Sequence, residues 1–152
     1  MYSKQQAALA TKQFWTAFGL YMSPVPSAEG EKINWINYKT GVKHVHFRMD
    51  AGKSGASIGI EITHPEIAYQ AIFYKKFSRL HSLLYDALQE EWQWQLQTTD
   101  ARGKTVTRIF TEIANLSVFN QQDWPALISF FKPKIIALDR FWCEARYAFE
   151  NL

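Results

Sequence analysis

The stretch HVHFRMDAGKSGASIGIEIT, residues 44–63, decides how this chain folds. On both sides of a Gly/Ser-rich turn, apolar residues occupy every second position: Val45, Phe47, Met49, Ile58, Ile60 and Ile62. Such alternation is typical of strands with one buried face, because successive side chains of a strand point to opposite sides. The stretch therefore predicts a β-hairpin with one apolar side and one polar side.

The register of this hairpin follows from the requirement that all its apolar residues share one side. A turn centred between residues 53 and 54 meets that requirement and gives three apolar pairs: Val45–Ile62, Phe47–Ile60 and Met49–Ile58. The same register places Asp50 opposite Ser57, and Glu61 opposite His46. The two acids then lie about four residues, or roughly 13 Å, apart along the hairpin.

The two acids invite comparison with the PD-(D/E)XK nuclease core, in which an Asp and a second acid hold a divalent metal. Asp50 and Glu61 fit that order, but Thr63 stands where the nuclease pattern has its lysine. Carboxylates separated by roughly 13 Å do not share one ion, whose oxygen ligands lie at about 2–2.6 Å. An active nuclease is therefore disfavoured, and a degenerate one is kept as an alternative.

The predicted register creates a different cluster on the polar side, formed by His44, His46 and Glu61. Two histidines and one carboxylate can bind a transition metal. The simpler interpretation is a cross-strand hydrogen bond between a histidine and the glutamate on an exposed sheet face. We therefore assign no metal, cofactor or catalytic residue, and keep a metal-dependent enzyme as an alternative.

The rest of the chain predicts further helices and strands around the hairpin. Helical spacing of apolar residues marks 5–22, a segment from THPE at 63–66 to about 90, and 121–150, where Pro133 is expected to kink the helix. Strand-like runs are found at 32–39, 92–99 and 104–113. The order α-βββ-α-ββ-α predicts an α+β fold, with a five-stranded, mainly antiparallel sheet and helices packed on one face.

The other face of this sheet is predicted to be polar and to form a binding surface. A two-residue turn at Thr40-Gly41 would place Trp35 opposite His46 on this face. In the strand 92–99, Trp92, Trp94 and Leu96 would face inward and the glutamines outward. The candidate binding surface comprises Trp35, His44, His46, Arg48, Glu61, Gln93, Gln95 and Gln97. Such mixed polar and aromatic surfaces are common in protein interfaces, whereas Arg48 beside an exposed Trp could also meet a phosphate and a base.

Length and composition indicate one domain, spanning 1–152. Hydrophobic residues make up 47% and aromatic residues 16% of the chain, which argues against disorder. The single cysteine, Cys143, excludes an intramolecular disulfide and a cysteine-cluster zinc site. Because there is no 18-residue apolar run and no secretion signal, we expect a cytoplasmic protein without membrane contact. The net charge of +3 favours anionic partners only weakly.

Four segments of the chain resemble a bacterial family described as domain of unknown function 4268. They are FWTAFGLYMSPVPSAEGEKINWINYKTGVKHVHFRMDA (14–51), SIGIEI (57–62), EEWQWQLQTTDARGKTVTRIF (90–110) and DWPALISFFKPKIIALDRFW (123–142). The resemblance is to stand-alone members of the kind found in Bacteroidetes-type bacteria. Related domains also follow an endonuclease-like part in longer proteins, which implies an accessory role in a DNA-related or defence setting. The family has no assigned catalytic residues, so the resemblance transfers none to this chain.

These observations favour a non-catalytic interaction module that binds a protein partner or associates with itself. No P-loop, GxGxxG, HExxH or GxSxG motif is present in the sequence. Direct nucleic-acid binding is kept as a further alternative beside the degenerate nuclease and the metal-dependent enzyme.

Overall fold

An antiparallel sheet forms the centre of the structure, a computed structural model that describes residues 3–150. Within those residues the sheet has four strands in the order β1-β2-β4-β3: β1 (Val45–Ala51), β2 (Gly55–Ile62), β4 (Thr105–Ala114) and β3 (Gln93–Thr99). The helices are α1 (Lys4–Met22), α2 (Ile67–Arg79), α3 (His81–Leu88) and α4 (Trp124–Ala145), with short 3-10 turns η1 (Gln121–Asp123) and η2 (Arg146–Phe149). The α+β class and the antiparallel sheet predicted from the sequence are confirmed.

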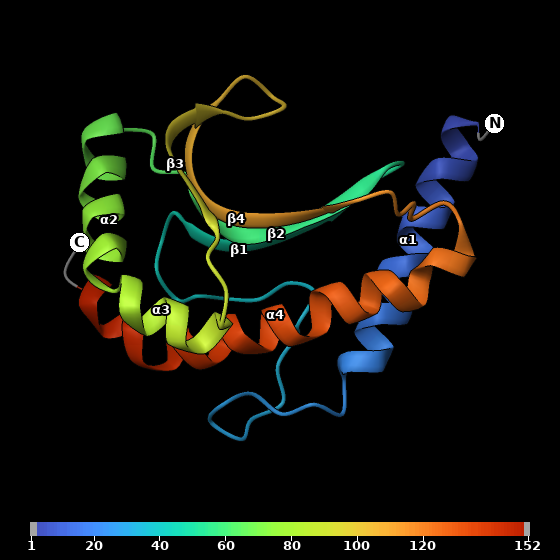
Figure 1. Ribbon diagram of the computed structural model, residues 1–152, viewed down its shortest axis with the longest axis horizontal. Coiled ribbons are helices and arrows are strands. Elements are labelled where there is room, and N and C mark those ends of the chain that lie inside the picture. The colour runs from blue at the N-terminus through green and yellow to red at the C-terminus, as the bar shows by residue number, and fades with distance from the viewer. Residues whose placement is uncertain (1–2, 151–152) are drawn as a thin grey trace.

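The helices lie on one side of the sheet and at its ends. In Figure 1, α4 runs beneath the sheet, α2 stands at one end and α1 at the other, while no described helix lies over the upper side. The buried side carries Ile58, Ile60 and Ile62 of β2, all fully buried in the same core as Phe131 and Trp142 of α4. None of the described helices has the length and apolar character needed to cross a membrane.

The register predicted for the hairpin at 44–63 is confirmed. β1 pairs with β2 through Val45–Ile62, Phe47–Ile60 and Met49–Ile58, with His46 opposite Glu61 and Asp50 opposite Ser57. β4 then pairs with the other edge of β2, so that Ile60 lies opposite Ile109. One-sided burial therefore fixes the central part of the sheet, because a shift by one residue would move the isoleucines into solvent.

The predicted strand at 32–39 is wrong, and the sheet has four strands instead of five. The side-chain oxygen of Asn34 accepts the backbone N–H groups of Ile36 and Asn37, both at 3.1 Å, which folds this segment into a turn. Trp35 is 2% exposed, and its indole N–H donates to the carbonyl of Val25 at 2.9 Å. The apolar residues of this segment thus pack into the core from a loop, without joining the ladder.

The single helix predicted from 63–66 to about 90 is also divided in the structure. Leu80 leaves the helical conformation, with φ −99° and ψ 12°, and separates α2 from α3. No glycine or proline marks this break in the sequence. Pro133 lies inside α4, within the range 121–150 predicted to be helical.

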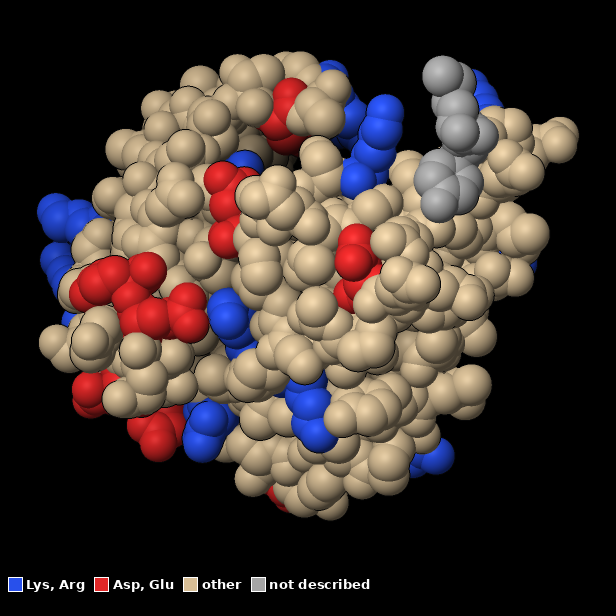
Figure 2. Space-filling view, turned by 45° about the vertical axis from the view of Figure 1, so that its right-hand side comes forward, with Lys and Arg blue, Asp and Glu red and all other residues tan. Residues whose placement is uncertain are grey.

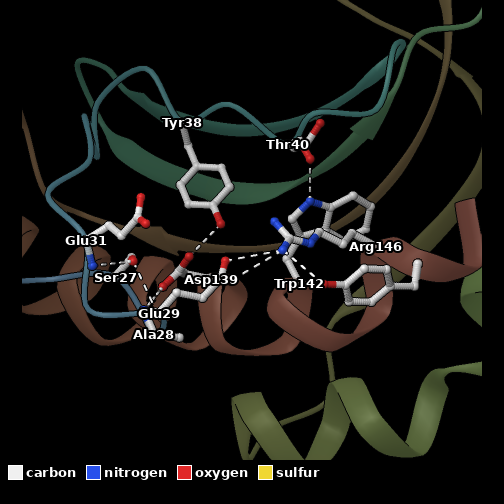
Figure 3. A network of polar contacts seen from close by, with 10 residues as sticks. Ser27, Ala28, Glu29, Glu31, Tyr38, Thr40, Asp139, Trp142 and Arg146 are labelled. Carbon is white, nitrogen blue, oxygen red and sulfur yellow. Dashed lines mark hydrogen bonds and ion pairs between the residues drawn. The ribbon is translucent and has the colours of Figure 1, made fainter. Parts of the chain in front are cut away.

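Polar contacts tie the loop between α1 and β1 to α4 (Figure 3). The buried carboxylate of Asp139, 6% exposed, accepts the hydroxyl of Tyr38 at 2.5 Å and the backbone N–H of Ala28 at 2.7 Å. The indole N–H of Trp142 donates to the carbonyl of Thr40 at 2.7 Å, and the Thr40 hydroxyl donates to the carbonyl of Val45 at 2.6 Å. These contacts fix the point at which the chain enters β1.

Removing the Tyr38 hydroxyl should lower the free energy of unfolding at neutral pH. It should also make the free energy of unfolding depend less on pH in alkaline solution. Burial first, and then the hydrogen bond to Asp139, raise the pKa of Tyr38 well above its ordinary value. Tyr38 therefore contributes stability below about pH 10 that is lost as the pH rises above the pKa of the unfolded chain. Tyr38→Phe should cost roughly 1.5–3 kcal/mol at pH 7, since the lost hydrogen bond has a charged acceptor.

Urea denaturation between neutral pH and about pH 11 measures this difference. Above about pH 10 the free energy of unfolding of the wild type should fall more steeply than that of Tyr38→Phe, by about 1.4 kcal/mol per pH unit. Parallel curves for the two proteins would show that the Tyr38 hydroxyl is not buried against Asp139 in solution.

Candidate functional site

The side of the sheet that no described helix covers is ordered in rows that cross the strands. We call this side the open face. Its three rows, read from the pairing of the strands, are His46–Glu61–Arg108–Gln95, Arg48–Gly59–Phe110–Gln93 and Asp50–Ser57–Glu112. Acidic, basic and amide side chains therefore alternate over a surface whose centre is occupied by a glycine and a phenylalanine.

Phe110 lies on the polar side of the sheet and is nevertheless only 4% exposed. The guanidinium carbon of Arg108 lies 3.9 Å above the centre of its ring, a cation–π contact. Across the strands, Gly59 leaves the space that the ring side chain needs, because a Cβ atom at Gly59 would lie 2.6 Å from the Phe110 Cβ. The guanidinium group of Arg108 thus lies over an aromatic ring in the middle of the open face.

The second arginine of the open face, Arg48, is held by an ion pair. Its Nε lies 3.2 Å from a carboxylate oxygen of Glu61, whose side chain is 16% exposed whereas that of Arg48 is 49% exposed. Glu61 also lies beside Arg108 in the same row. Glu61 is therefore ion-paired with Arg48 on one side and faces the residue Arg108 on the other, and the Arg48 side chain still reaches solvent.

His46 completes this group on β1, and its surroundings lower its pKa. Burial lowers the pKa of His46, the charge of Arg48 lowers it further, and Glu61 acts in the opposite direction. The Nε2 atom of His46 lies 3.2 Å from the hydroxyl of Thr63. The predicted His46–Glu61 neighbourhood is present, but Glu61 forms its ion pair with Arg48.

Five of the residues predicted for the binding surface lie on the open face: His46, Arg48, Glu61, Gln93 and Gln95. Trp35 does not, because it is buried in the loop beneath the sheet. His44 adopts a left-handed backbone conformation, with φ 69°, and its ring packs against His64 with 4.6 Å between centroids. A register shift between Gln95 and Thr98 includes Gln97, with φ 54°, whose side-chain amide donates to the carbonyl of Ile67 at 3.2 Å.

The same register shift exposes Leu96, which the alternation had placed in the core. The centre of the open face is instead occupied by Arg108 and Phe110, which the alternating pattern does not mark as surface residues. The sequence feature that points to Phe110 is Gly59, since a glycine inside a strand indicates that a neighbouring group approaches closely. That group is identified only by the pairing of β2 with β4, which no local pattern in the sequence predicts.

The side chains considered above as possible metal ligands do not come together in the structure. Within residues 3–150, no three or more His, Cys, Asp or Glu side chains are grouped so that they could hold a metal ion. His44 turns towards His64, and Glu61 towards Arg48, so the predicted set of His44, His46 and Glu61 is not assembled. Asp50 and Glu61 are four positions apart along the hairpin, as the register predicted.

Fold and surface together define an α+β protein with a helix-covered antiparallel sheet and an ordered polar face. The chain belongs to the family described as domain of unknown function (DUF4268), whose family model matches residues 10–146. This match confirms the family resemblance found in the sequence. No curated protein and no solved structure matches the chain.

The electrostatics of the open face can be tested by titrating His46. Arg48→Gln should raise the pKa of His46, because a neighbouring positive charge that opposes protonation is removed. Glu61→Gln should lower it, because a neighbouring negative charge is lost. NMR titration of the His46 ring proton measures both shifts, and shifts of the same sign in the two variants would contradict this arrangement.

The packing of Phe110 over Gly59 can be tested by adding one methyl group. Gly59→Ala should destabilise the protein by about 1–3 kcal/mol, because the new Cβ would also meet the Ile109 carbonyl oxygen at 2.6 Å. Gly52→Ala is the matched control, since an added Cβ there meets no atom within 4 Å. Equal urea midpoints for the two variants would contradict the close approach of β4 to Gly59.

Proposed function

We propose that the chain is a non-catalytic binding module that docks a protein partner on its open face. The observation that supports this proposal is the presence of two arginines whose side chains are already held in place, Arg48 by Glu61 and Arg108 by Phe110. Arginine is enriched among the residues that dominate binding energy in protein interfaces. A side chain that is ordered before binding loses less conformational entropy when the partner arrives.

The chemistry of the open face indicates what kind of partner surface it would accept. The two guanidinium groups and the amides of Gln93 and Gln95 offer N–H donors, which pair with carboxylates and backbone carbonyls. Asp50 and Glu112, in the next row, offer acceptors for the partner's own cations. This mixture favours a folded protein surface with charges of both signs over a uniformly charged ligand.

The same features weigh against nucleic acid as the occupant of the open face. Phe110 is only 4% exposed, so its ring is not available to stack on a base. Three carboxylates on this face, those of Asp50, Glu61 and Glu112, would repel phosphates. Figure 2, which looks at the molecule from the side and not onto the open face, shows lysines and arginines scattered among acidic and uncharged residues, without a continuous basic stripe.

Only the family resemblance suggests the biological process in which this binding would take place. Relatives that carry an endonuclease-like part support an accessory role in DNA-related or defence processes, with the cleavage performed by another protein. A degenerate nuclease remains the second interpretation of the same relationship.

Replacing Arg108 by Gln tests the proposed binding module. Arg108→Gln keeps part of the cover over Phe110 but removes the charge and the fork of N–H donors. Wild type, Arg108→Gln and the control Arg79→Gln, at the exposed end of α2, would each be immobilised and exposed to lysate of the host bacterium. A protein retained by wild type and control should bind Arg108→Gln about tenfold more weakly, as measured by calorimetry with the purified partner.

Two outcomes of this experiment would contradict the proposal. One is that every captured protein binds the three forms equally well. The other is that single- or double-stranded nucleic acid binds with a steep salt dependence that Arg108→Gln reduces, because that dependence reports phosphate contacts. Thermal melting followed by circular dichroism verifies that all three forms are folded.

A further inference from the structure

One edge of the sheet, formed by β1, has no strand beside it in the described residues. Edge strands expose unpaired backbone N–H and C=O groups, and proteins usually block them with proline, lysine or a bulge. β1 reads VHFRMDA, contains neither proline nor lysine, and pairs with β2 without a register shift. The other edge, β3, is distorted by the register shift between Gln95 and Thr98. β1 is therefore the regular, unblocked edge of this sheet.

The hydrogen bonds at the two ends of the hairpin show which backbone groups of β1 point outward. The N–H of Thr63 donates to the carbonyl of His44 at 2.9 Å. The N–H of Gly52 donates to the carbonyl of Gly55, also at 2.9 Å. In an antiparallel ladder every second residue bonds to the same neighbour. Even-numbered residues of β1 therefore bond to β2, and odd-numbered residues direct their backbone groups away from it.

The beginning of this outward edge is already occupied. The N–H of Val45 donates to the carbonyl of Val42 at 3.2 Å, and the carbonyl of Val45 accepts the hydroxyl of Thr40 at 2.6 Å. No described residue makes a corresponding contact with the outward backbone groups of Phe47, Met49 or Ala51. The free part of the edge is thus a short segment centred on Met49.

We propose that two copies of this chain associate through β1, as antiparallel neighbours related by a two-fold axis at Met49. In this register Met49 faces Met49 of the second copy, and Phe47 faces Ala51 of the second copy. All outward backbone groups of the free segment are then paired in both chains. The two sheets join into one continuous sheet, and both open faces lie on the same side of it.

The charged residues of β1 favour this register over the two registers shifted by one residue. With the axis at Met49, Arg48 faces Asp50 of the second copy, and Asp50 faces its Arg48, on the open face. Moving the axis by one residue in either direction would set Arg48 against Arg48, or Asp50 against Asp50. Opposite charges directly across a strand pair are stabilising and like charges destabilising. Asp50 makes no hydrogen bond or ion pair within the described residues and is exposed, so its carboxylate is available for this contact.

Association through the edge uses the outward backbone groups of β1, whereas docking on the open face uses side chains. The two share Arg48 and Asp50, but the edge does not involve Arg108. Association through the edge predicts a concentration-dependent dimer in the absence of any other protein. Its failure would leave the proposed partner binding at Arg108 untouched, and loss of partner binding in Arg108→Gln would leave the dimer intact.

Reversing one charge at a time and then mixing the two variants tests the proposal. Asp50→Arg gives a chain with two arginines at 48 and 50, and Arg48→Asp gives one with two aspartates. Each should dimerise with itself about tenfold more weakly than wild type, since both cross-chain pairs become repulsive. An equal mixture should restore the dimer, because both pairs are then of opposite charge. Analytical ultracentrifugation and native mass spectrometry measure these states.

The control is Asp86→Arg, which makes the same change on the exposed surface of α3 and should leave association unchanged. A wild type that sediments as a monomer at every concentration would overturn the proposal. So would a mixture of Asp50→Arg and Arg48→Asp that associates no better than its components. Circular dichroism of each variant excludes unfolding as the cause of lost association.

A cysteine at the centre of the edge tests the register independently, in a Cys143→Ser background. Met49→Cys should form a disulfide between the copies, because facing residues of a bonded pair have Cα atoms about 5.5 Å apart. The neighbouring variant Asp50→Cys should not, since residue 50 then faces residue 48 of the second copy. Cross-linking of Asp50→Cys in preference to Met49→Cys would overturn the register.

Discussion

The fold depends on the burial of one side of β2. Ile58, Ile60 and Ile62 are all fully buried, and β2 pairs with a strand on each side. Because side chains of a strand alternate with a period of two, this burial decides which residues of β1 and β4 face the core. The polar residues of all three strands are thereby gathered on the opposite side. The open face is therefore a consequence of the core beneath it.

The hairpin could be predicted from the sequence because all its constraints are local. Alternation and a short turn determine each pair, and the predicted pairs are those of the structure. The segment 32–39 also alternates, but the Asn34 side chain offers its backbone N–H groups a competing acceptor, so the segment turns. An alternating pattern shows which residues are buried without showing whether their backbone joins a sheet.

The composition of the open face was only partly predictable for a related reason. His46, Arg48 and Glu61 follow from the hairpin, whereas Arg108 and Phe110 reach the same face through the pairing of β2 with β4, which are distant in sequence. Left-handed conformations at His44 and Gln97 turn two predicted members away, and neither residue is a glycine that would have marked such a turn. The polar face is thus assembled from local patterns, but its centre is decided by a long-range strand pair.

The anchoring of the α1–β1 loop on α4 has a consequence for how the chain folds. The hydrogen bonds that hold this loop join residues 101, 102 and 111 positions apart in the sequence. Contacts between such distant residues slow folding, because a long stretch of chain must be ordered before they form. During synthesis, the loop that leads into the first strand must wait for the last helix to emerge. We therefore expect the attachment of this loop to Asp139 to form late in folding, after the local contacts of the hairpin.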